Sequence, residues 1–119
     1  MNRFLLLSLF ILSVLFFGCD KIASDQIKYE VTLINCSSWS GSYFNQDASL
    51  ISITGGSSGW TKSFTNSNGL TALSLQAIPD NFGTVSGMDA LLKIYVNGQM
   101  VASGNYSSLG SQGLIYSFP

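Results

Sequence analysis

Apolar and polar side chains alternate along short runs from residue 27 to the C-terminus. In the first run Ile27, Tyr29 and Val31 alternate with Lys28 and Glu30. This period of two predicts a half-buried strand, because successive side chains of a strand point to opposite faces. No eleven-residue window after residue 26 shows the 3.6-residue period of an amphipathic helix, so we expect almost no helix. Turn residues separate the apolar runs, which predict further strands at 38–45, 48–54, 60–65, 70–78, 90–96, 99–104 and 113–118.

The dipeptide Asn97-Gly98 lies between two of these runs and is the strongest local signal in the chain. Both residue types accept the positive φ angles of a type I′ turn, whose twist suits a two-residue hairpin loop. Such a loop pairs Val96 with Gln99. Continuing the ladder by two steps pairs Ile94 with Val101. The face expected to meet the core then consists of Leu92, Ile94, Val96 and Val101.

Eight short strands separated by turns are typical of a β-sandwich. Residues 27–119 are enough for one domain with one modest core. We therefore expect an all-β domain, an immunoglobulin-like antiparallel β-sandwich of about 7–8 strands. The longest irregular segment is 79–88, where a function carried by a loop would lie.

The first eighteen residues have a different pattern. Arg3 is the only charge before an apolar run at 4–17, which is the layout of a secretory signal peptide. The run is shorter than the roughly twenty apolar residues that a membrane-spanning helix needs. The junction Gly18-Cys19 resembles a lipobox, in which a small residue precedes a cysteine that is acylated after cleavage. The alternative is ordinary secretion with Cys19 as a free or paired thiol.

The lipobox resemblance implies a bacterial lipoprotein with a cleaved signal peptide at 1–18, lipid attached to Cys19 and a short tether at 19–26. Two or three acyl chains anchor durably, because each buried methylene adds about 0.8 kcal/mol of membrane affinity. The expected location is the cell envelope, on the inner or outer membrane, with the domain periplasmic or extracellular. Membrane lipid is then the first expected partner.

Composition narrows the possible partners. Charged residues make up 9% of the chain, well below the roughly 25% of ordinary soluble domains. After the signal peptide, four lysines stand against six carboxylates, so the net charge is minus two. Four scattered lysines make no basic stripe, so we expect no nucleic-acid partner. Cys36 has no partner within the chain if Cys19 carries lipid, and we interpret it as a small buried apolar residue, with a reactive or intermolecular thiol as the alternative.

The sequence contains little that could perform catalysis. It has no histidine, which removes the commonest general base and the commonest metal ligand. Asp80 and Asp89 lack the oxygen-ligand spacing of a calcium loop, and turn or solvation roles fit them better. The glycines of 55–59 lead into a strand without the lysine and helix of a phosphate loop. We expect no enzyme activity, no metal and no cofactor.

Exposed aromatic side chains are the remaining candidates for ligand contact, because they can stack on sugars or lipids. The alternation places Trp60 on a face with Lys62 and Phe64, and Tyr95 on the hairpin face opposite the core set. We select Trp60 and Tyr95 as candidate ligand-binding residues. The alternative for both is a place in the core.

The strand pattern from Lys28 to Phe118 covers most of the mature chain, and it contains the best local match at 92–99 and weaker ones, in chain order, at 29–32, 59–61 and 75–77. In these segments the chain resembles the MmpS family of transport accessory proteins. The resemblance implies an immunoglobulin-like periplasmic sandwich that assists an RND-type exporter of lipids or siderophores and has no catalytic residues. Family members usually have an N-terminal helix in place of the lipid and a C-terminal cysteine pair that this chain lacks.

These features together predict a membrane-anchored, non-enzymatic binding or accessory module of the envelope, with an envelope protein as a second partner. Two other functions remain open. One is a surface module that binds glycan or peptide. The other is a structural or adhesive lipoprotein whose open sheet edges pair with a neighbour, since its neutral strands lack protective charges.

Overall fold

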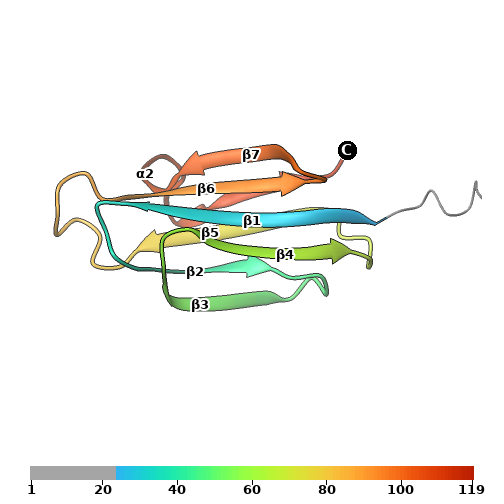
Figure 1. Cartoon of the computed structure of the whole chain (residues 1–119), viewed down its shortest axis with the longest axis horizontal. Helices are drawn as coiled ribbons and strands as arrows, with labels where there is room; N and C mark the ends of the chain where they lie inside the picture. Colours follow the sequence, from blue (N-terminus) through green and yellow to red (C-terminus); the bar gives the residue numbers. More distant parts are fainter. Residues whose placement is uncertain (1–23) are drawn as a thin grey trace, which may run out of the picture.

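Two antiparallel four-stranded sheets pack face to face in the computed structural model, which describes residues 24–119 (Figure 1). The all-β sandwich expected from the alternation is confirmed. The seven strands with predicted bounds all begin and end within two residues of them, and the first strand begins two residues before Ile27. The strands are β1 (Asp25–Ile34), β2 (Trp39–Phe44), β3 (Leu50–Gly56), β4 (Trp60–Asn66), β5 (Ala72–Pro79), β6 (Asp89–Val96), β7 (Gln99–Asn105) and β8 (Leu114–Ser117).

The strand order is β4-β1-β6-β7 in the first sheet and β3-β2-β5-β8 in the second. The first strand therefore lies inside its sheet, between β4 and β6, whereas the constant-type immunoglobulin order has its first strand at an edge. The edge strands β4 and β3 follow each other in the chain and lie on the same side of the sandwich, as Figure 1 shows.

The core lies between the sheets and follows the predicted alternation. In β1 the side chains of Ile27, Tyr29 and Val31 are buried, and in β5 every second residue from Leu73 to Ala77 is buried. Burying apolar side chains of this size contributes about 1.5–3 kcal/mol each. The largest fully buried side chains are Trp39, Tyr29, Ile27, Leu73, Leu75, Leu92, Ile94, Val31 and Pro79.

The β6–β7 hairpin departs from the predicted register after its first two pairs. The turn has φ angles of 53° at Asn97 and 79° at Gly98, as a type I′ turn requires. Val96 pairs with Gln99 as predicted, but Ile94 pairs with Ala102 instead of Val101. The prediction was wrong there because a β-bulge gives β7 one extra residue, and turn chemistry contains no information about a bulge several residues away.

Two short helical segments join β7 to β8, namely α2 (Tyr106–Leu109) and the 3-10 helix η1 (Gly110–Gln112). One turn is too short to show helical periodicity in a sequence, so these segments were not predicted. Leu109 packs so closely on Gly104 that a Cβ at Gly104 would lie 2.7 Å from its Cδ1. No helix within residues 24–119 is long and apolar enough to cross a membrane.

The two ends of the sandwich differ in what they carry. The near end is where β1 begins, together with the turns at 45–49, 67–71 and 97–98 and the C-terminus (Figure 1). The far end carries the connections at 35–38, 57–59, 80–88 and 106–113. The longest loop therefore lies at the end opposite to the point where the N-terminal segment enters the domain.

Candidate functional site

Cys19, the predicted lipid attachment site, and the signal peptide at 1–18 lie outside the described residues. The described chain enters β1 at Asp25, two residues before the expected start of the domain at Ile27. Asn97 explains this early start: its Oδ1 accepts a hydrogen bond from the Gln26 backbone N–H (2.9 Å), and its Nδ2 donates to Asp25 Oδ1 (2.8 Å). Any tether from Cys19 therefore enters the sandwich at the near end.

Trp60 is half-buried, which corrects the expectation that it is exposed. It pairs with Val31, whose side chain points into the core, so Trp60 points the same way. Its ring lies 5.2 Å from the ring of Trp39 in a T-shaped arrangement and 5.4 Å from the ring of Tyr43. Alternation correctly grouped Trp60 with Lys62 and Phe64, but sequence alone did not show which face of β4 meets the core.

Tyr95 lies on the outer face of the first sheet, opposite the core set, as predicted. It pairs with Lys28, whose Nζ lies 5.0 Å from the ring centroid in a cation–π contact, and the ring is half-buried. A shallow hollow of about 280 Å³ lies beside it, lined by Gln26, Ile27, Lys28, Ser63, Tyr95 and Gly98. Trp60 and Tyr95 thus point to opposite faces of the sheet and do not form one platform.

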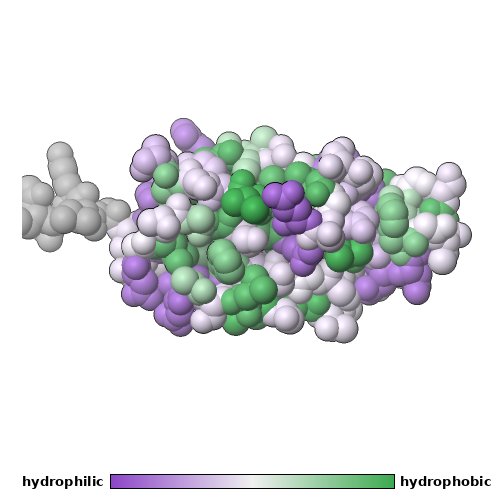
Figure 2. All heavy atoms as spheres, turned by 180° about the vertical axis from the view of Figure 1, so that it is seen from behind, coloured by the Kyte–Doolittle hydropathy of each residue, from purple (hydrophilic) through white to green (hydrophobic). Residues whose placement is uncertain are grey.

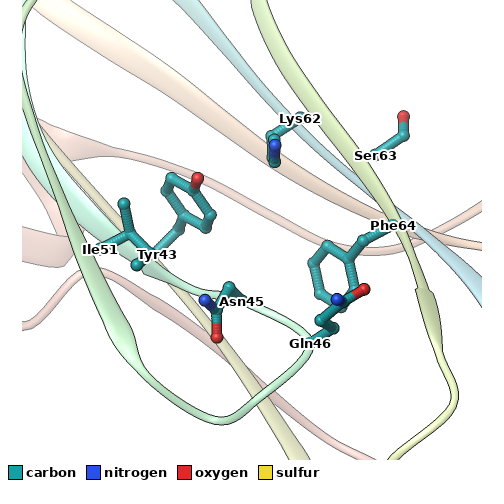
Figure 3. Close-up of a pocket in the computed structure, with 7 residues that line it drawn as sticks. All are labelled: Tyr43, Asn45, Gln46, Ile51, Lys62, Ser63 and Phe64. Atoms are coloured by element: carbon teal, nitrogen blue, oxygen red, sulfur yellow. The ribbon is translucent and has the colours of Figure 1, made fainter.

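A second and larger hollow opens on the side of the sandwich, between the edge strands β3 and β4. We call it the side hollow; its volume is about 340 Å³. Figure 3 shows the rings of Tyr43 and Phe64 on its two sides, the Lys62 side chain pointing into it, and the side chains of the β2–β3 turn below. It is lined by Tyr43, Asn45, Gln46, Ile51, Lys62, Ser63 and Phe64.

Lys62 reaches the side hollow because of its register on β4. It pairs with Tyr29, which is fully buried, so the lysine occupies an inward-facing position between the half-buried Trp60 and Phe64. Such a position normally holds an apolar side chain. An inward-pointing lysine on an edge strand also discourages pairing with another chain. In the sequence, Lys62 was noted only as a neighbour of Trp60. Its position between two aromatic residues of the same face could have indicated that it points inward.

Asp80 fixes one end of the loop 80–88 at the far end. Its carboxylate accepts hydrogen bonds from the hydroxyls of Ser38 (2.6 Å) and Ser40 (2.8 Å), which hold the pKa of Asp80 below its usual range. The Asp80 backbone N–H also donates to the Ser38 carbonyl (2.9 Å). The predicted turn role of Asp80 is therefore confirmed, and the turn is tied to β2.

Asp89 fixes the other end of the same loop. Partial burial favours a higher pKa for Asp89, but hydrogen bonds outweigh it and the pKa is lowered. The donors are the Ser107 hydroxyl (2.6 Å), the Ser107 and Ala90 backbone N–H groups, and the Asn105 amide. Asp89 thus joins β6 to α2. Within residues 24–119 no group of three acidic or cysteine side chains is placed to hold a metal ion.

The pinned loop exposes apolar side chains at its tip. Phe82 is 47% exposed and Val85 is 55% exposed, and Ile34 at the end of β1 is 41% exposed. The Phe82 ring packs edge-on against Tyr106, with centroids 4.9 Å apart, so contact with α2 helps to hold the ring in place. Figure 2 shows apolar residues among polar ones at this end of the molecule.

Cys36 lies close to the same loop. It is half-buried, and its Sγ lies 3.5 Å from the Asp89 carbonyl oxygen, where it makes a weak hydrogen bond. This agrees with a packing role, although the residue is less buried than expected.

Comparison with known proteins does not identify a family: no family model matches the chain, and no curated protein matches it.

Proposed function

We propose that the protein is a lipid-anchored, non-enzymatic binding module of the bacterial cell envelope that contacts another envelope protein through its far end. In this proposal the signal peptide at 1–18 is removed, Cys19 carries the lipid, and the near end faces the membrane. The single observation that carries the proposal is the loop 80–88, which is pinned at both ends and exposes Phe82 and Val85.

The geometry of the loop suits protein recognition. Aspartate hydrogen bonds hold both ends of the loop, so little ordering entropy is lost when a partner binds. Aromatic and aliphatic anchors dominate the energetics of such contacts. The ten residues of β1 span about 33 Å at the usual rise, which displays the loop well away from a membrane at the near end.

The partner that we propose is a membrane machine, and the resemblance to the MmpS family supports an RND-type exporter. An accessory protein of this kind needs no catalytic residues.

Site-specific photo-crosslinking in cells tests the proposed contact. The full chain carries a photoreactive amino acid at Val85, and a matched control carries it at Thr61, an exposed residue on the outer face of the first sheet. We expect Val85 to capture one envelope protein and Thr61 to capture none. Equal capture from both positions, or capture from neither, contradicts the proposed contact.

The anchor has a separate test by intact mass of the protein extracted from its native membrane. We expect a chain that starts at Cys19 with added acyl mass, and a Cys19→Ala variant without that mass. An unmodified mature chain would make this a freely secreted domain and would remove the support for a membrane role.

A second candidate function is adhesion through sheet edges, and β3 favours it. This edge strand has no charged residue and no proline, and its Leu50 is 58% exposed. Unprotected edges of this kind pair with other chains. A protein that stays monomeric at millimolar concentration would argue against this function.

A further inference from the structure

We propose that the side hollow binds a saccharide unit that carries a carboxylate. This inference goes beyond the proposed protein contact and depends neither on the lipid anchor nor on the far-end loop. It rests on the aromatic walls of the hollow, on its hydrogen-bond donors, and on Lys62, which pairs with no carboxylate among residues 24–119.

The aromatic walls of the side hollow are held in place from beneath. The fully buried ring of Tyr29 lies between Tyr43 and Phe64, with centroid distances of 5.6 Å and 5.7 Å. Two rings braced on a rigid base offer flat apolar surfaces to a guest that enters from the side (Figure 3). Ligand sites typically combine such surfaces with a few polar groups that set orientation.

The polar groups of the hollow include several hydrogen-bond donors. The Asn45 side chain is fixed because its Oδ1 accepts the backbone N–H groups of Asp47 and Ser49, both at 3.0 Å. The Asn45 Nδ2 group is therefore available as a donor, and it has no hydrogen-bond acceptor within residues 24–119. Gln46 and Lys62 add further donors at the same opening. A guest rich in acceptor oxygens, such as hydroxyl and carboxylate groups, matches this set.

The charge of the hollow selects an anion. In the described part of the chain the only ion pair joins Lys28 to Glu30 on the outer face, so Lys62 has no carboxylate within 4 Å. The nearby Asp47 accepts a hydrogen bond from the Asn68 side chain (3.1 Å). One cation suits a single carboxylate better than a phosphate, which usually recruits arginine or several donors. Aromatic walls that can stack on a sugar ring, amide donors and one ammonium group together fit an acidic sugar.

Titration of the full-length protein in detergent micelles tests the proposal. The probes are methyl β-glucuronide and its uncharged counterpart methyl β-glucoside. The readouts are the tryptophan fluorescence, to which Trp60 on Tyr43 contributes, and the amide NMR shifts of the lining residues. The variant Lys62→Gln removes the charge, Lys62→Arg retains it, and Lys93→Gln on the outer face of the first sheet is the matched control.

We expect the glucuronide to shift the resonances of Tyr43, Asn45 and Lys62 with a millimolar Kd and the glucoside to bind more weakly. Lys62→Gln should weaken glucuronide binding roughly fivefold, as the loss of one exposed ion pair predicts, whereas Lys62→Arg and Lys93→Gln should retain it. Equal binding of both sugars, binding unaffected by Lys62→Gln, or no shift at all would overturn the proposal. Increased self-association of Lys62→Gln with no effect of either sugar would assign Lys62 to edge protection alone.

Discussion

At the scale of single residues, two aspartates determine how the long loop is held. Asp80 and Asp89 stand at its two ends, and each accepts hydrogen bonds from serine hydroxyls on another segment. The bonds favour the ionised carboxylates, because an anion is a stronger acceptor than a neutral acid. Because the pKa of each aspartate is lowered, the stability that these bonds contribute depends on pH.

Replacing Asp89 by Asn should lower the free energy of unfolding at pH 7 by about 1.5 kcal/mol, because the amide accepts fewer of the bonds from Ser107 and Asn105. The folded-state pKa is below the unfolded value of about 3.9, so this stability is present above pH 4 and is lost as the pH falls through the folded value. Urea unfolding of the wild-type protein and of Asp89→Asn at pH 7 and pH 3 measures this contribution. The difference in unfolding free energy between the two proteins should be smaller at pH 3.

The exposed Asp47→Asn serves as the control for this measurement and should change stability by less than about 0.5 kcal/mol. An Asp89→Asn difference that is the same at both pH values would show that charge is not the source of the stability.

At the scale of elements, the β6–β7 turn fixes the start of β1. The Asn97 side chain bonds Asp25 and Gln26, and its backbone N–H donates to the Gln26 carbonyl (2.8 Å). The same residue adopts a positive φ of 53°. Asn97 therefore supplies both the turn conformation and a clamp on a neighbouring strand, and only the first of these roles was evident from the Asn97-Gly98 dipeptide.

Two substitutions at Asn97 separate these roles. Asn97→Gly keeps the positive φ and removes the side-chain bonds, so we expect it to cost about 1 kcal/mol and to increase hydrogen exchange at Gln26. Asn97→Ala loses both and should cost about 1 kcal/mol more. Thermal unfolding and amide exchange measure these effects. Equal stability of the wild-type protein and Asn97→Gly would show that the clamp contributes nothing.

At the scale of the whole molecule, Tyr29 joins the two sheets. Its hydroxyl, carried by β1, donates to the Phe44 carbonyl at the end of β2, across the core, at 2.8 Å. Burial is the main cause of the raised pKa of Tyr29. The protonated phenol is therefore the form that holds the sheets together, and stability should depend on alkaline pH.

Tyr29→Phe should cost about 1–2 kcal/mol at pH 7, which lowers Tm by several degrees, because the Phe44 carbonyl loses its donor. The contribution of Tyr29 is complete below its unfolded pKa of about 10 and is lost as the pH rises toward the higher folded value. The stability difference between the two proteins should therefore narrow above pH 10.

Tyr116→Phe is the matched control for this variant, since Tyr116 is half-buried on the β8 side and its hydroxyl has no protein partner among the described residues. Its effect on stability at pH 7 should be small. A stability difference for Tyr29→Phe that remains constant through pH 11 would contradict the link between ionisation and sheet packing.

The sequence by itself determined the strands and the buried face of the first one. Alternation in β1 grouped Tyr29 with Ile27 and Val31 on one face, because a strand has a side-chain period of two and its apolar face is the one that leaves water. The turn at Asn97-Gly98 was also local information, since only a few residue types accept its φ angles. These properties depend on neighbours in the chain.

Tertiary structure decided which strands lie at the sheet edges and which side chains line the hollow between them. The alternation groups Trp60, Lys62 and Phe64 on one face of β4 but does not say whether that face points inward. The pairing of β4 with β1 decides this, and it places Trp60 against the core and Lys62 in the side hollow. The hollow combines β2, β3 and β4, and the loop clamps combine Asp80 and Asp89 with serines of β2 and α2. Such contacts join residues far apart in the chain, so their position follows from packing and not from local pattern.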